Sequence, residues 1–267
     1  MKKLDSVNYK QAFHVYKQAR PFFAIIGAVL EGKQGGLVFT DSNSHPASFF
    51  VVHKFGFSQC FYISKNDSFV RQVISLLSAN KENLRWGLPD KIRLYAPNQQ
   101  FQDDLGGGRI SQIQKSERVQ MRLSDEARKK HQDLEEVDVN NARNDFERLN
   151  IELNLGLNQR FWDSKEDFLE GGQGYFVQLK ATKEIVSLCY AAAMSNMIAE
   201  IDILTAEKFR GKGFASIAAN IFINNCLGSG IIPNWDCYTN NLPSLNLAIK
   251  LGFKEAMVYD FYTVSFK

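Results

Sequence analysis

The stretch from Ile198 to Ala215, I-A-E-I-D-I-L-T-A-E-K-F-R-G-K-G-F-A, restricts the possible folds of this chain more than any other part. Its first half is a short apolar run rich in β-branched residues, interrupted by Glu200 and Asp202, which predicts a buried strand. Its second half is a glycine loop that opens a helix, whose apolar positions continue to Gly228-Ser-Gly230. This succession predicts an α/β fold built on a sheet.

The glycine loop has the composition of an anion site. Gly211 and Gly213 leave backbone N–H groups accessible at the helix start, with the positive end of the helix dipole behind them. Arg210 and Lys212 add two positive charges, which favours a di- or triphosphate group over a carboxylate. For the loop taken alone, a glycine turn with solvated basic residues is the alternative interpretation.

The surrounding residues resemble a known family. R-G-K-G-F-A at 210–215 fits the Arg/Gln-x-x-Gly-x-Gly/Ala loop of the GCN5-related N-acetyltransferases (GNAT), and N-L-P-S-L-N-L-A-I-K-L-G-F at 241–253 is similar to that superfamily's last helix and its Gly-Phe ending. The branch that includes the zwittermicin A resistance acetyltransferase resembles this chain at Cys226, Pro233-x-Trp235-Asp236, Asn241-x-x-Ser244 and Leu251-Gly252-Phe253. The resemblance covers about residues 113 to 267.

The resemblance implies an N-acetyltransferase that moves an acetyl group from acetyl-coenzyme A to a small amine. The backbone of Ile203, Leu204 and Thr205 would bind the pantetheine arm as an added strand, and one N–H would polarise the thioester carbonyl. Further cofactor contacts are implied for Arg210, Gly211, Lys212, Gly213, Phe214, Ala215, Ser216, Asn241 and Ser244. Helix capping explains Asn241 equally well.

Acyl transfer to an amine requires a base more than a nucleophilic side chain. A thiol leaves near pKa ~8.5, whereas a lysine-type amine holds its proton to ~10.4. Glu200 and Asp202 alternate onto one face of the predicted strand, roughly 7 Å apart, and can accept that proton directly or through water. A sheet-edge or salt-bridge role is the alternative, equally weighted for Glu200. Asp236 is a third candidate, for binding a cationic substrate or for a structural hydrogen bond.

One position departs from the family pattern. Many members place a tyrosine seven residues after the helix-opening asparagine as an acid for the thiolate, and this chain has Ala248 there. The acid is then open among Ser244, Tyr238 and solvent. The departure motivates a second hypothesis, a non-catalytic acyl-coenzyme A sensor or interaction module. A nicotinamide-binding enzyme is a third, although Ser216 stands where a dinucleotide fingerprint needs its third glycine.

Residues 1–112 are predicted to form a smaller α/β domain, and residues 113–267 the acetyltransferase domain. In the first we expect helices within 8–30, strands at 36–40, 47–53 and 59–64, a helix capped at 66–68 and a strand at 92–96. This order resembles a degenerate acetyltransferase half without its cofactor loop. Gly106-Gly107-Gly108 marks the predicted boundary, and a phosphate loop there is less favoured because no basic helix start follows.

The second domain is predicted to be a mixed, mostly antiparallel sheet flanked by helices. After a strand at 119–123, the charged region to about Asn150 is expected to be helical, and Ser164 with Asp167 predicts a capped helix start. Strands are expected at 174–179, 184–194, 198–205, 231–237 and 257–266, with helices from 213 and at 241–251.

Composition argues against several other classes of function. The net charge of +3 over 267 residues is too small to indicate a nucleic-acid partner. The longest apolar run, 22–30, is too short to span a bilayer, and the start lacks a secretory apolar region, so we expect a cytoplasmic protein without a membrane partner. The four cysteines lack C-x-x-C spacing and the four histidines are scattered, so neither disulfides nor a metal are expected. The oligomeric state and the amine remain open.

Overall fold

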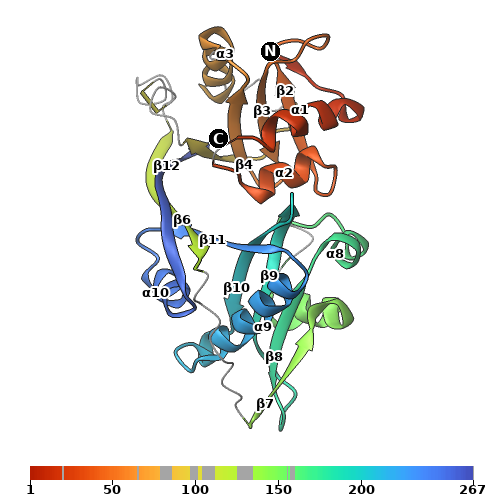
Figure 1. Cartoon of the computed structure of the whole chain (residues 1–267), viewed down its shortest axis with the longest axis vertical. Helices are drawn as coiled ribbons and strands as arrows, with labels where there is room; N and C mark the ends of the chain where they lie inside the picture. The colour runs from red at the N-terminus through yellow and green to blue at the C-terminus, as the bar shows by residue number, and fades with distance from the viewer. Residues whose placement is uncertain are drawn as a thin grey trace. The chain divides into compact units, whose positions relative to one another are not determined.

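The computed structural model describes residues 1–19, 21–64, 66–78, 86–96, 102–103, 112–124, 135–154, 156 and 160–266 (Figure 1). The chain divides into two compact units, Met1–Arg118 with Val258–Lys267, and Val119–Met257. Each combines helices with a mostly antiparallel sheet, which confirms the predicted fold class. The division into domains 1–112 and 113–267 stays a prediction, and Gly106–Gly108 lies outside the described residues.

The first unit contains a sheet with the strand order β1-β2-β3-β4-β5-β12. Its elements are β1 (Lys2–Lys3), η1 (Ser6–Asn8), α1 (Tyr9–Tyr16), α2 (Ala24–Leu30), β2 (Gly36–Thr40), β3 (Ser48–His53), β4 (Phe57–Tyr62), α3 (Asp67–Ser78), β5 (Lys91–Ala96) and, from Val258 on, β12 (Phe253–Ser265). β4 and β5 are parallel, since α3 crosses over between them, and the other neighbouring pairs are antiparallel. The helices and strands predicted here are therefore present.

The two faces of this sheet are covered by different helices. The apolar face of α3, including Phe69 and Val73, packs into a core with β-strand residues such as Ile92, and Cys60 packs against that core. Gln59, the preceding residue of β4, bonds instead to Tyr16 of α1. Because side chains alternate between the faces of a strand, α1 lies on the face opposite α3.

The second unit contains the strand order β6-β11-β10-β9-β8-β7. Its elements are β6 (Ile113–Leu123, from Val119 on), β7 (Val137–Asn141), η2 (Ala142–Asp145), α6 (Phe146–Glu152), α8 (Lys165–Gly171), β8 (Gly174–Leu179), β9 (Ile185–Ser195), β10 (Ile198–Thr205), η3 (Glu207–Phe209), α9 (Phe214–Gly228), β11 (Ile232–Tyr238), α10 (Leu242–Lys250) and the start of β12. β10 and β11 are parallel, joined by α9, while β7 to β10 form an antiparallel meander.

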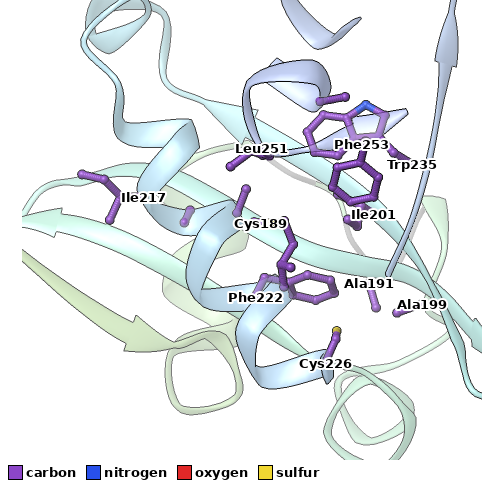
Figure 2. Close-up of a cluster of buried hydrophobic side chains, with 14 of the residues drawn as sticks. Cys189, Ala191, Ala199, Ile201, Ile217, Phe222, Cys226, Trp235, Leu251 and Phe253 are labelled. Carbon is purple, nitrogen blue, oxygen red and sulfur yellow. The ribbon is translucent and has the colours of Figure 1, made fainter. Parts of the chain in front are cut away.

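The core of the second unit lies between α9 and the sheet. Phe222 and Cys226 of α9 are fully buried beside the β9 residues Cys189 and Ala191 (Figure 2). Small residues on β9 let the helix approach the sheet closely, and burying a phenylalanine side chain contributes about 1.5–3 kcal/mol. The crossover helix is thereby fixed on β8 to β11, which also fixes where its glycine-rich start lies.

One predicted element is wrong and two differ in length. The charged region up to Asn150 is not one helix, because Val137 and Val139 lie in β7 and the helix α6 begins only at Phe146. The V-x-V alternation finds a partner in β8, where Val139 faces Val177, and this pairing of residues distant in sequence overrides helix propensity. Residues 125–134 lie outside the described part. β6 and β12 begin earlier than predicted.

Candidate active site

β10 and β11 are paired only at their starts. Their parallel register joins Ile198 to Ile232 and ends with Glu200 opposite Asn234, although β10 continues to Thr205. Within the described residues, the edge of β10 beyond Glu200 therefore has no strand partner on the β11 side. An unpaired strand edge offers backbone N–H and C=O groups to an extended ligand. The predicted pantetheine contacts Ile203, Leu204 and Thr205 all lie on this half-buried stretch.

The loop before α9 adopts the backbone that its glycines predict. Gly211 has φ 77° and Gly213, the N-cap of α9, has φ 90°, both in the left-handed region that glycine tolerates best. A Cβ atom added at either position would have no other atom within 4 Å, so the loop surface is open there. Within the described residues no acceptor receives the backbone N–H of Gly211, Lys212, Gly213, Phe214 or Ala215. These N–H groups are therefore available to an anion.

The charges around the loop favour the same ligand. α9 has fifteen residues and no acidic residue in its first turn, so its positive end is not compensated from within the helix. Arg210 is held at the loop by a 3.4 Å hydrogen bond from its Nε to the carbonyl of Thr205, and Lys212 Nζ lies 5.3 Å from the ring centre of Phe209. The amide of Ser216 already donates to Gly213, so only its hydroxyl is left for a cofactor contact.

Glu200 lies at the point where the two strands separate. Its side chain is buried, with 7% of the residue exposed, and the amide nitrogen of Asn234 lies 3.1 Å from each carboxylate oxygen. The register on the other side of β10 shifts here, since Glu200 faces Ala193 of β9 and the next residue faces Ala191. The extra residue, Ala192, belongs to β9, so Glu200 lies directly beside an irregularity of the neighbouring strand.

Asp202 has a more crowded environment. Its Oδ2 accepts a 2.6 Å hydrogen bond from the hydroxyl of Tyr190 and lies 3.6 Å from Nη2 of Arg160, while its Oδ1 accepts from the amide of Ile203 at 3.1 Å. Tyr190 is fully buried; burial raises the pKa of its phenol well above 10, and the charge of Asp202 raises it further. Asp202 therefore forms a salt bridge with Arg160, which is the alternative role considered for it in the sequence analysis.

Both carboxylates lie on the same face of β10. Ala199 and Ile201, which alternate with them, belong to the core beneath α9. The alternation of side chains along a strand therefore directs Glu200 and Asp202 to the opposite face, as predicted. On that face Arg160 contacts Asp202 and Phe161 packs near Tyr190, and both come from the segment between β7 and β8.

The start of α10 is tied to β11. Asn241 caps the helix by accepting from the amide of Ser244 at 3.4 Å, and the indole N–H of Trp235 donates to the Ser244 hydroxyl at 3.1 Å. Trp235 itself packs on Phe253 in the core (Figure 2). Ala248 is fully buried in that helix, so the place of the family's tyrosine is occupied by core packing.

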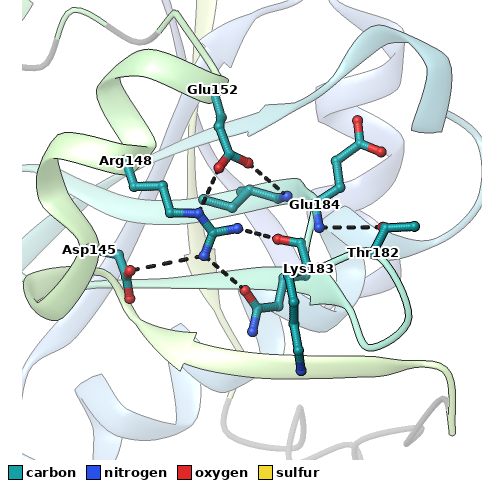
Figure 3. A network of polar contacts seen from close by, with 8 residues as sticks. Asp145, Arg148, Glu152, Thr182, Lys183 and Glu184 are labelled. Carbon is teal, nitrogen blue, oxygen red and sulfur yellow. Dashed lines mark hydrogen bonds and ion pairs between the residues drawn. The ribbon is translucent and has the colours of Figure 1, made fainter.

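A polar hollow of about 960 Å³ lies elsewhere in the same unit, between α6, the β8–β9 turn and η3. Arg148 of α6 bonds to Glu152 of the same helix, to Gln178 of β8 and to the carbonyl of Lys183 in the β8–β9 turn (Figure 3). Lys208 pairs with Glu184 across the hollow. The basic groups here are matched by acidic ones, and the lining includes no residue of the glycine loop, so this hollow is distinct from the predicted donor site. Its network supports η3, which leads into that loop.

Among the described residues no three histidine, cysteine, aspartate or glutamate side chains are grouped to hold a metal ion. In the same part of the chain, no helix has the length and apolar character required to span a membrane. Cys189, Cys226 and Cys237 are buried free thiols, and Cys60 is a half-buried one.

Sequence reasoning missed three residues at the site. Asn234, the partner of Glu200, is a polar residue inside a buried strand, and that mismatch could have marked it. Tyr190 and Arg160 contact Asp202 through strand register and a distant segment. No local pattern in the sequence predicts either contact.

A parallel pair of strands that separates beside a glycine-rich helix start is the central feature of this candidate site. The model of the GNAT acetyltransferase family matches residues 20–262, so the chain belongs to this family. The narrower resemblance to the zwittermicin A resistance branch stays a prediction.

Individual relatives agree with this assignment. An uncharacterized N-acetyltransferase of Bacillus subtilis (strain 168), YdfB, is 38% identical over 110 residues, which are 41% of each chain. A GCN5-related N-acetyltransferase-like protein from Streptococcus suis 89/1591 has a similar structure, with TM-score 0.69, 23% identity, and coverage of 97% of this chain and 99% of that one. A tandem GNAT protein from the clavulanic acid biosynthesis pathway gives TM-score 0.66 at 10% identity, covering 100% and 98%. At these identities the two structures show the fold alone.

Proposed function

We propose that this protein transfers an acetyl group from acetyl-coenzyme A to a primary amine of a small molecule by direct attack. The observation that carries the proposal is the row of amides from Gly211 to Ala215, which have no acceptor among the described residues, next to the edge of β10 that no described strand pairs with beyond Glu200. A diphosphate at those amides and an extended arm along Ile203 to Thr205 would bring a thioester toward the end of the strand pairing. The family assignment supports the same chemistry.

The reaction then needs a neutral amine beside the thioester carbonyl. The amine nitrogen forms a bond to the carbonyl carbon, the C–S bond breaks, and the proton of the amine passes to a base while the thiolate leaves. Glu200 is the base we propose, because its carboxylate lies where β10 and β11 separate, on the same face of β10 as Asp202.

Asp202 serves a different role in this proposal. Its oxygens already accept from Tyr190 and Ile203 and contact the cation of Arg160, so it is built to hold a positive charge. We assign it to binding the protonated acceptor before proton loss. Ser244 is the candidate donor of a proton to the thiolate, since its oxygen accepts from Trp235 while its own hydrogen remains to be donated.

Calorimetric titration with acetyl-coenzyme A tests the donor site. We expect the double variant Gly211→Asp/Gly213→Asp to lose binding, because two carboxylates would face the diphosphate. Gly230→Asp is the matched control: its φ is 70° and its surroundings are equally open, but it follows the other end of α9. Equal affinity in the double variant and the control would refute the site, as would absence of binding by the unaltered protein.

Turnover distinguishes an enzyme from a sensor that only binds the donor. Release of free thiol from acetyl-coenzyme A should depend on the added amine across a library of small amines. Buried Ala248 at the tyrosine position is the feature that favours a sensor. Donor binding without amine-dependent thiol release would select the sensor hypothesis.

A further inference from the structure

The two units contain the same succession of elements. In the first, β1 is followed by helices α1 and α2, then β2, β3, β4, α3 and β5; in the second, β7 is followed by α6 and α8, then β8, β9, β10, α9 and β11. The strand orders match as well, β1 to β5 corresponding to β7 to β11. Agreement of every strand and of the crossover helix, in order, is difficult to reach without an internal repeat.

The parallel pairs agree residue for residue. β4 pairs with β5 from Phe57 opposite Arg93 to Gln59 opposite Tyr95 and then stops. β10 pairs with β11 over its first three residues and stops at Glu200. Gln59 therefore occupies the place of Glu200, and both side chains point away from the crossover helix of their own unit.

The side chains around Gln59 differ from those around Glu200. Gln59 is neutral and buried, and its carbonyl oxygen accepts a 2.6 Å hydrogen bond from Tyr16, itself fully buried. On the partner strand, Tyr95 stacks on Phe23 at 3.8 Å between ring centres. Aromatic side chains thus fill the region where the second unit has a carboxylate and an amide.

The start of the crossover helix is also occupied by side chains in the first unit, unlike the start of α9 in the second. At α3 the side chain of Asn66 accepts the amide of Phe69 at 3.1 Å, which occupies the helix start internally. The Asn66 amide donates to Asp41, whose carboxylate also accepts from Ala47 and Ser48. Burial alone would raise the pKa of Asp41, but hydrogen bonds from Ala47, Ser48 and Thr40 outweigh it and lower the pKa, so a negative charge stays beside the helix start. Asp67 adds an acidic residue in the first turn.

We infer that the first unit is a second acetyltransferase-type half whose donor site is filled by its own side chains, so that each chain binds one acetyl-coenzyme A, in the second unit. This rests on the proposed function for the donor. Tyr16 and Gln59 fill the position that corresponds to Glu200. Asn66 and Asp41 occupy the start of α3, which corresponds to the start of α9 where we propose that the diphosphate binds. The first unit then keeps the acetyltransferase-type fold but binds no acetyl group donor.

Stoichiometry of acetyl-coenzyme A binding to the full chain tests the inference. Calorimetry and native mass spectrometry should both give one molecule per chain. The variant Gly211→Asp/Gly213→Asp should abolish that binding. Ser68→Asp puts one negative charge on an exposed position in the first turn of α3 and should leave stoichiometry and affinity within twofold of the unaltered protein. Thermal unfolding of each variant shows whether it is folded.

Each outcome is decisive. Two molecules per chain would overturn the inference while leaving the proposed function intact. One molecule that survives the glycine changes but is lost in Ser68→Asp would place the donor in the first unit and overturn it as well. Absence of binding by the unaltered protein would instead refute the proposed function, and with it the premise that either unit holds the donor.

Discussion

The hydroxyl of Tyr190 donates to Oδ2 of Asp202 across the β9–β10 pair, with 2.6 Å between the two oxygens. Removing it by Tyr190→Phe should lower the free energy of unfolding by about 1–2 kcal/mol, because a hydrogen bond to a charged group is lost. It should also lower kcat/KM for the amine several-fold, since Asp202 loses its fixed orientation. Urea unfolding and steady-state kinetics measure the two effects.

A double-mutant cycle with Asp202→Asn assigns both effects to this contact. If the hydroxyl acts through Asp202, the tyrosine change should cost less in a protein that already carries Asp202→Asn than in the unaltered protein. Fully additive losses would show that Tyr190 acts through packing, for example on Phe161, whose ring centre lies 6.4 Å away.

The same phenol gives a pH prediction. Burial, and then the negative charge of Asp202, raises the pKa of Tyr190 well above 10 in the folded protein. An unfolded tyrosine releases its proton near 10, so above that pH the unfolded state binds fewer protons and the stability from this residue is lost as pH rises. Absorbance of ionised tyrosine between pH ~9 and ~11 should be the same for the native protein and for Tyr190→Phe. A smaller signal in the variant would contradict this.

Glu200→Gln tests the proposed base. The substitution keeps the shape of the side chain but removes its capacity to take a proton, so kcat should fall by about 10²-fold or more. Affinity for acetyl-coenzyme A should stay within twofold, because Glu200 does not belong to the loop that we assign to the diphosphate. An unchanged kcat would move the base to Asp202 or to water. Asp202→Asn is the matched control, and we expect it to affect KM more than kcat.

The glycine loop allows a comparison between two equally strained positions. Gly213→Ala and Gly230→Ala each put a side chain on a left-handed residue, φ 90° and 70°, with open space around it. Both should therefore lose about 1–2 kcal/mol of stability. Only Gly213→Ala should also weaken acetyl-coenzyme A binding, by about tenfold, because its methyl group stands at the start of α9. Equal affinities for the two variants would argue against a diphosphate there.

Local patterns predicted much of this fold because the deciding interactions were local. The helix predicted to open from the glycine loop begins at Phe214, and Ser164 caps α8 through the amide of Asp167 at 3.0 Å. Strand and helix identities from Gly36 to Ala96 followed from the period of the apolar residues.

What sequence could not predict depends on partners distant along the chain. β7 became a strand because Val139 faces Val177, and the bulge between Glu200 and the next residue depends on β9. The environments of the two carboxylates depend on Asn234 and Tyr190 for the same reason. Glu200 and Asp202 are only two positions apart, yet their surroundings differ. The difference comes from the residues that the strand register places opposite them and not from their neighbours in the sequence.

Ser244 separates a structural from a catalytic role at the start of α10. Its hydroxyl accepts the indole N–H of Trp235, a residue only 4% exposed, so Ser244→Ala leaves a buried donor without its acceptor and should cost about 1–3 kcal/mol of stability. We expect kcat to fall by less than tenfold, because a thiol near pKa ~8.5 can leave without a proton. Adding Trp235→Phe removes the orphaned donor, and the stability difference made by Ser244→Ala should then shrink. A fall in kcat of a hundredfold or more that persists in this double variant would instead make Ser244 an obligatory acid for the thiolate.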